Sequence, residues 1–445
     1  MKRIFCILLC SIFILSCLTS CTVVDKRPKL LIMGNDCNYP SSLMYNIFKR
    51  AGCDLGLTYK ALSRDNFLYT AFDGFYTSNK ADIVKSNIVV LSEYGNAGAF
   101  TRRAVEKIIE KCGPKKKYYY IASDSDGDYP NGYTRVLEGL NIGFIRLGAV
   151  HDYLLYGQDK YDLNYEDFHG DDDLATNYLQ TVSAITIIDT VNEFDTSVKL
   201  DAFNDKSYVP GGTDEEKESF LAYLEYVVRN IDTLSPPPVY EPSADELNIL
   251  MLGNSMRYYG ESDRVLNELC FATGMKINID RYFKPWATPE TLLNEFSFYE
   301  DAFKRADMVV FQDMSSGIFE KYIKKDPDKF YISNFTYAGL NDFEKQYVGL
   351  DLYHQNEIIY YVENNCDFDK RLLYNSADGY HPSDLYAFLI ALDYYNSIEP
   401  MKNTTLTYDD LTPKMKYYLP YKTENEKRAF FDLVNEKTRT HDYLS

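Results

Sequence analysis

Three segments of this 445-residue chain occur twice in similar form and in the same order. Residues 30–36 match residues 249–255, residues 166–169 match residues 378–381, and residues 208–217 match residues 418–427. The first pair shares an apolar run that ends in Gly-Asn, and the third pair shares Tyr-x-Pro followed by Thr and Glu-Lys. Because a fixed order with a slowly changing separation is typical of an internal repeat, the sequence predicts two copies of one domain.

A proline-rich stretch separates the two copies. Residues 235–242 read Ser-Pro-Pro-Pro-Val-Tyr-Glu-Pro, which cannot continue a helix or a central strand and favours an extended spacer. We therefore expect a first domain at residues 22–234, a linker at residues 235–246 and a second domain at residues 247–445. Two domains also fit the length of the chain, which exceeds what one hydrophobic core usually spans.

Short β-rich runs alternate with helical stretches in each copy, which favours an α/β layered fold with a mainly parallel sheet. In the second copy we expect five strands, at residues 248–252, 276–280, 308–311, 330–333 and 371–374. Five strands are enough for a doubly wound sheet, in which ligands gather beyond the carboxyl ends of the strands. The residues that follow the strand at 248–252 are therefore the first candidates for function.

The composition excludes one class of partner. The formal net charge is -19, and no lysine- and arginine-rich stripe offsets it, so nucleic acid is not expected as a partner. The 41 tyrosines are the unusual feature of the composition. We expect most of them to pack half-buried, although exposed tyrosine rings can also stack on sugar faces.

The N-terminus has the layout of a secretory signal peptide, because Lys2 and Arg3 precede a short apolar run at residues 4–18. The run ends in Leu-Thr-Ser-Cys at residues 18–21, which resembles the lipobox of bacterial lipoproteins. The resemblance implies that residues 1–20 are removed, that Cys21 carries a lipid, and that the exported protein is anchored to a membrane of the bacterial cell envelope. The alternative is an ordinary signal peptide followed by a chance cysteine.

Three polar residues of the second copy could form a catalytic triad. Ser255 follows an apolar strand at a strand-to-helix turn, where its hydroxyl can project from the sheet. Asp378 and His381 open a later helical pattern, so one segment could supply both an imidazole and the carboxylate that orients it. Each residue also has a purely structural interpretation, as a helix cap, a turn residue or a solvated side chain. Their order and their places at predicted strand ends favour the triad.

With these motifs the second copy resembles an SGNH (GDSL-type) hydrolase. Residues 253–255 read Gly-Asn-Ser, a variant of the first block of that family, and residues 378–383 read Asp-Gly-Tyr-His-Pro-Ser, which matches the last block. The resemblance implies tandem flavodoxin-like, three-layer domains with mainly parallel five-stranded sheets. It implies Ser255 as the nucleophile, His381 as the general base and acid, and Asp378 as the residue that holds the imidazole. No cofactor or metal is needed for this route.

The oxyanion donors of that family are not matched. Residues 284–288 replace the glycine of the second block, and residues 312–317 replace the Gly-x-Asn-Asp of the third. Oxyanion donors typically contribute a factor of about 100 to 1,000 in rate, so their loss would leave a weak enzyme. We expect the side chain of Gln312 or Ser315, together with backbone amides, to substitute for them.

The first copy has lost the serine, because Asp36 stands at that position and cannot perform the serine chemistry. Glu166 and His169 remain from the last block. Asp36, His169 and the acidic run at residues 171–173 could hold a metal. We favour a degenerate remnant without a metal, because no ligand spacing here is diagnostic.

Two functions follow from these patterns. The first is a surface-anchored serine ester hydrolase that removes acyl groups from acylated glycans or small esters. The alternative is a non-catalytic lipoprotein in which two hydrolase-like domains bind a glycan or a protein. The hydrolase is the leading hypothesis, and the unmatched oxyanion blocks and the tyrosine content motivate the alternative.

Overall fold

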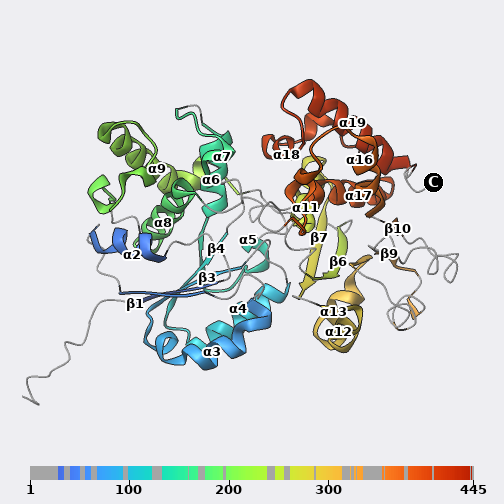
Figure 1. Ribbon diagram of the computed structural model, residues 1–445. Helices are drawn as coiled ribbons and strands as arrows, with labels where there is room; N and C mark the ends of the chain where they lie inside the picture. Colours follow the sequence, from blue (N-terminus) through green and yellow to red (C-terminus); the bar gives the residue numbers. More distant parts are fainter. Residues whose placement is uncertain are drawn as a thin grey trace, which may run out of the picture.

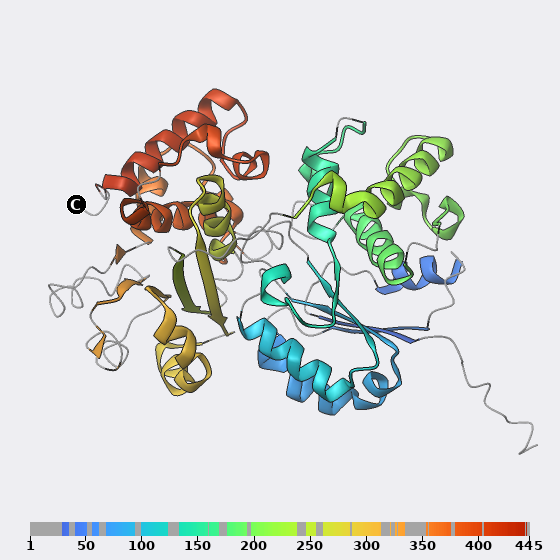
Figure 2. The same cartoon turned by 180° about the vertical axis from the view of Figure 1, so that it is seen from behind.

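The structure is a computed structural model that describes residues 29–34, 41–50, 56–61, 68–93, 99–122, 133–158, 160–168, 176–193, 197–237, 246–254, 261–284, 287–312, 321, 325–326, 328–333, 353–354, 356–374, 379–402, 405–440 and 442. These residues form two α/β units, which lie side by side in Figures 1 and 2. None of the described helices is long and apolar enough to cross a membrane.

Five parallel strands form the first sheet, in the order β2-β1-β3-β4-β5. The strands are β1 (Lys29–Gly34), β2 (Gly56–Ala61), β3 (Ile88–Ser92), β4 (Lys117–Ile121) and β5 (Gly143–Ile145). The helices of this unit are α2 (Ser41–Arg50), α3 (Leu68–Lys85), α4 (Ala99–Cys112), α5 (Tyr133–Val136), α6 (Leu147–Tyr156), α7 (Tyr165–Phe168), α8 (Asn177–Val191) and α9 (Asp214–Leu234), with 3-10 turns η2 (Leu200–Ala202) and η3 (Lys206–Tyr208).

The first unit has three layers because alternate strand residues face opposite sides of the sheet. Leu31 and Leu91 pack in one core cluster with α3, α4 and α5. Leu30 and Val90 pack in another with α2, α6, α8 and α9. In Figure 1 α3 and α4 lie below the sheet, whereas α2, α6, α8 and α9 lie above it.

Five parallel strands also form the second sheet, in the order β10-β9-β8-β6-β7. The strands are β6 (Leu247–Gly253), β7 (Ile277–Phe283), β8 (Met308–Phe311), β9 (Phe330–Ser333) and β10 (Tyr353–His354). The helices are α11 (Ser262–Ala272), α12 (Pro289–Asn294), α13 (Phe296–Arg305), α16 (Asn356–Asn365), α17 (Asp384–Lys402), α18 (Pro413–Tyr417) and α19 (Glu424–Thr440), with 3-10 turns η6 (Lys370–Leu373) and η7 (Tyr408–Asp410).

The second unit is layered in the same way. Leu250 and Val309 pack with α12 and α13, whereas Ile249 and Val310 pack with α11, α16, α17 and α19. Counted along the chain, both sheets place the second strand first, followed by the first, third, fourth and fifth strands. This is the flavodoxin-like strand order, so the predicted fold class is confirmed for both units.

One predicted strand of the second copy is wrong. Residues 371–374 fall in the 3-10 turn η6 and an isolated bridge from Tyr374 to Pro382, and the fifth strand is the two-residue β10. The reason is local: the Asp369 side chain accepts a hydrogen bond from the Arg371 amide at 3.1 Å, which closes a turn at the point where a strand would begin. Because residues 372–374 are apolar, the sequence pattern predicts a strand there and the turn at Asp369 is missed.

Contacts at the amino ends of the strands recur between the units. In the first unit the Lys29 amide donates to the Asn87 side chain at 2.9 Å. In the second unit the Asn248 amide donates to the Asp307 side chain at 2.9 Å. The residues at positions 87 and 307 also donate their own amides to strands β1 and β6, both at 2.8 Å.

A second set of repeated contacts lies at the start of the fourth strand of each unit, β4 and β9. The Lys116 ammonium donates to carbonyls at the end of α3, and the Lys329 ammonium donates to carbonyls at the end of α13. The Tyr118 hydroxyl and the Tyr331 hydroxyl each bond a carbonyl five residues earlier, at 2.7 and 2.8 Å. The repeat found in the sequence therefore extends to individual hydrogen bonds.

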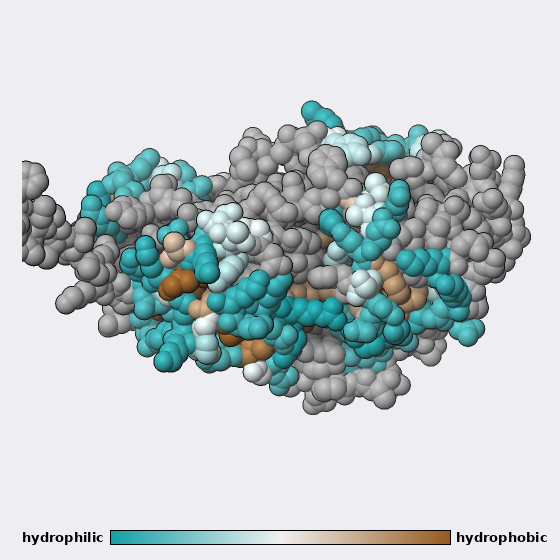
Figure 3. Space-filling model, turned by 90° about the horizontal axis from the view of Figure 1, so that it is seen from below, coloured by the Kyte–Doolittle hydropathy of each residue, from teal (hydrophilic) through white to brown (hydrophobic). Residues whose placement is uncertain are grey.

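The domain limits stay a prediction, although helix α9 ends at Leu234 and strand β6 begins at Leu247. Most of the predicted linker lies outside the described residues. On the face drawn in Figure 3, the described residues are mostly hydrophilic and the hydrophobic ones form small, separate patches.

Candidate functional site

The carboxyl end of the first sheet meets the second unit through helix α4, which follows β3. Phe100 in the first turn of α4 packs edge-on against Tyr282 near the carboxyl end of β7, with ring centroids 5.4 Å apart. Phe100 is only 1% exposed, so the contact is fully buried. Beside it, the exposed Arg103 guanidinium lies 3.5 Å from the Asp301 carboxylate of α13. We call this region, where α4 and α6 face the second unit, the junction (Figures 1 and 2).

Two amide side chains close the carboxyl edge of the second sheet. The Asn254 backbone amide donates to Oε1 of Gln312 at 2.7 Å, and Nε2 of Gln312 donates back to Oδ1 of Asn254 at 2.6 Å. Nδ2 of Asn254 donates to the Ala287 carbonyl at 3.0 Å. Gln312 therefore lies at the strand end where the sequence placed it, but its amide joins the ends of β6 and β8 instead of pointing outward as an oxyanion donor.

A polar cluster of Tyr282, Lys284 and Glu295 continues the same edge. The Glu295 carboxylate accepts from the Tyr282 hydroxyl at 2.6 Å and pairs with the Lys284 ammonium. Burial raises the pKa of the Tyr282 phenol well above its usual range, and the hydrogen bond to Glu295 raises it further. Tyr282 thus stays a neutral donor while its ring carries the contact with Phe100.

The carboxyl edge of the first sheet holds a second buried polar group. The Thr101 hydroxyl donates to the Glu93 carboxylate at 2.5 Å, and both side chains are 1% exposed. Next to them Gly34 approaches Ser92 so closely that an added Cβ would lie 2.3 Å from the serine Oγ. Only glycine fits at the end of β1, and a polar pair lies under the edge that faces the junction.

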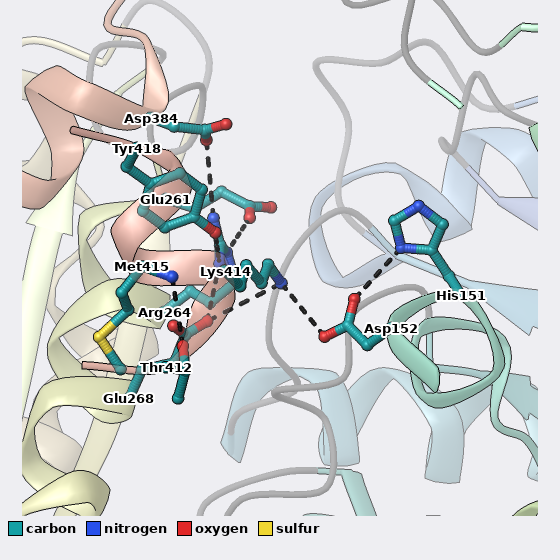
Figure 4. A network of polar contacts seen from close by, with 10 residues as sticks. All are labelled: His151, Asp152, Glu261, Arg264, Glu268, Asp384, Thr412, Lys414, Met415 and Tyr418. Carbon is teal, nitrogen blue, oxygen red and sulfur yellow. Dashed lines mark hydrogen bonds and ion pairs between the residues drawn. The ribbon is translucent and has the colours of Figure 1, made fainter. Parts of the chain in front are cut away.

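A buried arginine organises the first turns of α11 (Figure 4). Arg264 is 3% exposed. Its guanidinium donates to Glu261 at 2.5 Å, to Glu268 at 2.9 Å and to the Tyr418 hydroxyl at 2.8 Å, and lies 3.6 Å from Asp384. A buried charge is stable only when it is paired, and this guanidinium is paired with three carboxylates.

The same network crosses the junction. The Lys414 ammonium of α18 lies 3.8 Å from Glu268 in its own unit and 3.9 Å from Asp152 of α6 in the other unit. Asp152 in turn bonds Nδ1 of His151 at 3.2 Å. Figure 4 shows these side chains as one continuous series of alternating charges from α6 to α11. The charges at the junction therefore tie the helix that follows β5 to the helix that follows β6.

The backbone at the start of this network is strained. Glu261 has a φ of 52° and is 8% exposed, a left-handed conformation that costs energy for a residue with a side chain. The ion pair to Arg264 holds it in place. Such strain clusters at functional sites, which supports the junction as the site to consider.

His381 lies just before α17, whose first residue, Asp384, is the one that reaches Arg264. The His381 ring is half-buried and packs edge-on against Tyr380, with centroids 5.4 Å apart. Tyr380 is 65% exposed, the most exposed of the large hydrophobic side chains described. This segment therefore presents an exposed aromatic ring four residues before Asp384 in the chain.

The remaining predicted site residues lie outside the described part of the chain: Ser255, Asp378, Ser315, Cys21, Asp36 and His169, with the side chain of Glu166. The structure therefore does not test whether Ser255, Asp378 and His381 meet. Among the described residues, no group of three or more histidine, cysteine, aspartate or glutamate side chains is arranged to hold a metal.

Sequence reasoning missed the junction network. The spacing of Glu261, Arg264 and Glu268 on one helix face was a usable signal, because residues three and four apart on a helix are neighbours. The partners Asp152 and Lys414 lie far away in the chain and carry no local signal. Their pairing comes only from the packing of the two units.

No family model matches the chain, and no curated protein matches it. Three solved structures illustrate the similarities found. They are a candidate sugar-binding protein from Salmonella typhimurium (9% identity, 70% of this chain and 79% of that chain, TM-score 0.21), a candidate phosphosugar isomerase from Clostridium difficile (12%, 83% and 84%, 0.21), and tagatose-6-phosphate ketose/aldose isomerase from Escherichia coli (12%, 69% and 70%, 0.20). Likeness at this level carries no argument about function.

The prediction that the second copy belongs to the SGNH hydrolases is wrong. No family model supports it. The amide of Gln312, expected as an oxyanion donor, is bonded to Asn254. The comparisons also give no support to a signal peptide or a lipoprotein, and the envelope location stays a prediction that nothing here tests.

Proposed function

We propose that the protein binds carbohydrate at the junction of its two α/β units, and that it does so without hydrolysing an ester. The observation that carries the proposal is the meeting of the two units at the carboxyl side of the first sheet and at β7. In doubly wound sheets the carboxyl edge is where ligands bind, and interfaces between domains are preferred sites for small polar molecules.

The chemistry at the junction suits a neutral, hydroxyl-rich ligand. The amide and carboxylate groups of Asn254, Gln312 and Glu93, at the two carboxyl edges, are already hydrogen-bonded within the protein. The charges of Arg264, Lys414 and their partners are already compensated within the protein. A ligand without a charge of its own fits this balance best.

Tyr380 supplies the apolar part of such a site. Its ring is 65% exposed and is held edge-on against His381. Open aromatic rings stack on the apolar face of a sugar, and the polar hydroxyl remains in water. This gives one of the chain's many tyrosines a specific role.

The test is a glycan array probed with the full chain, followed by calorimetry with a bound oligosaccharide. Tyr380→Ala should weaken binding by about tenfold, the loss of one stacking contact worth about 1.4 kcal/mol. Since the ring is largely exposed, the variant should keep the stability of the wild type. Tyr226→Ala is the matched control, because Tyr226 is 52% exposed on α9, away from the junction residues.

Two outcomes contradict the proposal. The first is an array with no glycan bound above background by the wild type. The second is equal weakening by Tyr380→Ala and Tyr226→Ala, which would mean that binding does not involve the junction.

A further inference from the structure

A basic cavity lies at the opposite side of the first sheet from the junction. It has a volume of about 650 Å³ and opens at the amino ends of β3 and β4. Four lysines line it: Lys85, Lys115, Lys116 and Lys117. The chain has a net charge of -19, so four lysines around one cavity make a locally positive region on a negatively charged protein.

Among the described residues that line this cavity, one is acidic. Glu193 pairs with the ammonium of Lys117. The Lys116 ammonium donates instead to the Val84 carbonyl at 3.1 Å and to the Ser86 carbonyl. Carbonyl groups carry no net charge, and no carboxylate within the described part of the chain pairs with this ammonium. Burial lowers the pKa of Lys116, because a half-buried ammonium loses hydration. An anion in the cavity would restore the stabilisation that burial removes.

The duplicated unit provides an internal comparison. Lys329 makes the same two carbonyl contacts as Lys116, but its ammonium also lies 3.4 Å from the Asp326 carboxylate. The Tyr331 hydroxyl bonds the carbonyl of Asp326, and the Tyr118 hydroxyl bonds the carbonyl of Gly113 in the same way. Gly113 therefore stands where the second unit has its neutralising carboxylate.

The same substitution pattern extends around the cavity. The positions of Asn87, Lys115 and Lys117 in the first unit are occupied in the second by Asp307, Asp328 and Phe330, respectively. The second unit has thus exchanged neutral and basic groups for acidic and apolar ones at one repeated location. A solvated surface has no reason to differ so consistently in sign between two copies of one fold.

The last basic residue of the cavity, Lys85, also differs from its counterpart in the second unit. Arg305 of the second unit is neutralised by Asp280 at 3.0 Å, across from strand β7. Its counterpart in the first unit, Lys85, is exposed, and the strand position matching Asp280 is Thr58. At this location Lys329 and Arg305 of the second unit each have a carboxylate partner. The equivalent positions in the first unit carry no carboxylate.

We propose that the cavity of the first unit binds a doubly charged oxyanion, a phosphate or sulfate group carried by a small molecule, and that the second unit has lost this site. Lysine ammonium groups bind phosphate as point charges, and several of them around one cavity favour a dianion over chloride. The volume lies within the range of small-molecule sites. This site is separate from the junction and does not depend on carbohydrate binding there.

The proposal is tested by calorimetric titration of the full chain with inorganic phosphate and with inorganic sulfate, at an ionic strength held constant with chloride. We expect one site for at least one of the two dianions. Lys85→Glu and Lys115→Glu should each weaken binding by about tenfold, because each reverses a charge close to the bound anion. Lys80→Glu, the same charge change at an exposed position of α3 outside the cavity, should leave affinity within twofold of the wild type.

Binding of phosphate alone would assign the site to phosphate esters, and binding of sulfate alone would assign it to sulfate esters; both results support the proposal. The proposal is overturned if neither dianion gives heat beyond that of chloride, or if Lys80→Glu weakens binding as much as Lys115→Glu. Tyr380→Ala should not change anion binding, so this result and the carbohydrate result can fail independently.

Discussion

Asp189 offers a quantitative test of how burial controls the stability of the first unit. Its side chain is 0% exposed on α8, facing α9. Burial raises its pKa from 3.8 to about 7; the Arg229 guanidinium, 3.6 Å away and partly exposed, opposes the shift only in part, and the Glu225 carboxylate adds to it. The ion pair with Arg229 is therefore too long and too solvated to keep this carboxylate charged below neutral pH.

The sign and size of the effect follow from the pKa shift. Below pH 4 Asp189 is protonated in both the folded and the unfolded chain, so its ionisation takes nothing from the free energy of unfolding. Between pH 4 and pH 7 the unfolded chain gives up the proton while the folded chain keeps it, so stability falls as the pH rises. A shift of about three units at about 1.36 kcal/mol per unit puts the loss near 4 kcal/mol above pH 7.

The change to make is Asp189→Asn, which removes the charge and keeps the shape of the side chain, and the second unit holds a buried amide in its corresponding helix, α17. Between α17 and α19, Asn396 donates to Asn435 at 2.9 Å and to Thr438 at 2.6 Å. Urea unfolding at pH 4 to 8 should show no gain for Asp189→Asn at pH 4 and a gain rising to about 4 kcal/mol at pH 8. The opposite change, Asn396→Asp, is the matched control and should lose stability over the same pH range. A gain that is constant with pH, or largest in acid, would refute the reasoning.

Three further predictions concern the junction and the sheet edge. Arg264→Met should cost about 3–5 kcal/mol in urea unfolding, because it leaves carboxylates such as Glu268 buried without their partner; a cost below about 1 kcal/mol would contradict the account of the network. Phe100→Ala should cost about 3–5 kcal/mol and speed amide hydrogen exchange in β7, and unchanged exchange there would mean that the ring does not hold the units together. Gln312→Ala should cost about 1–3 kcal/mol, because the buried amide of Asn254 loses its partner, with Gln312→Glu expected to recover part of it; equal stability of Gln312→Ala and the wild type would argue against the paired amides.

Most strands could be predicted because their signals are local. The strands β1 and β6 are apolar runs that end at Gly34 and Gly253, and the repeat indicates that both copies follow the same plan. The two-residue strand β10 escaped because it is too short to show a pattern. The turn capped by Asp369 was mistaken for a strand because the residues after it are apolar.

The site was harder to predict because it depends on contacts between distant residues. The sequence placed Gln312 correctly at the end of a strand, but its hydrogen bonds to Asn254 span 58 positions. The pair of Arg103 and Asp301 spans 198 positions, and nothing near either residue points to the other. Chemistry read from a motif fixes which groups are present, whereas packing decides which of their atoms are still free to act.

The burial of Phe100 has a consequence for how the protein is made. Its ring belongs to a core cluster whose other described members all come from the second unit. A ribosome adds about 5–20 residues per second, so roughly 10–40 s pass between the synthesis of Phe100 and that of Tyr282. During that interval the Phe100 ring of the nascent first unit is exposed to solvent. It becomes buried only when the second unit has been translated and has folded against it.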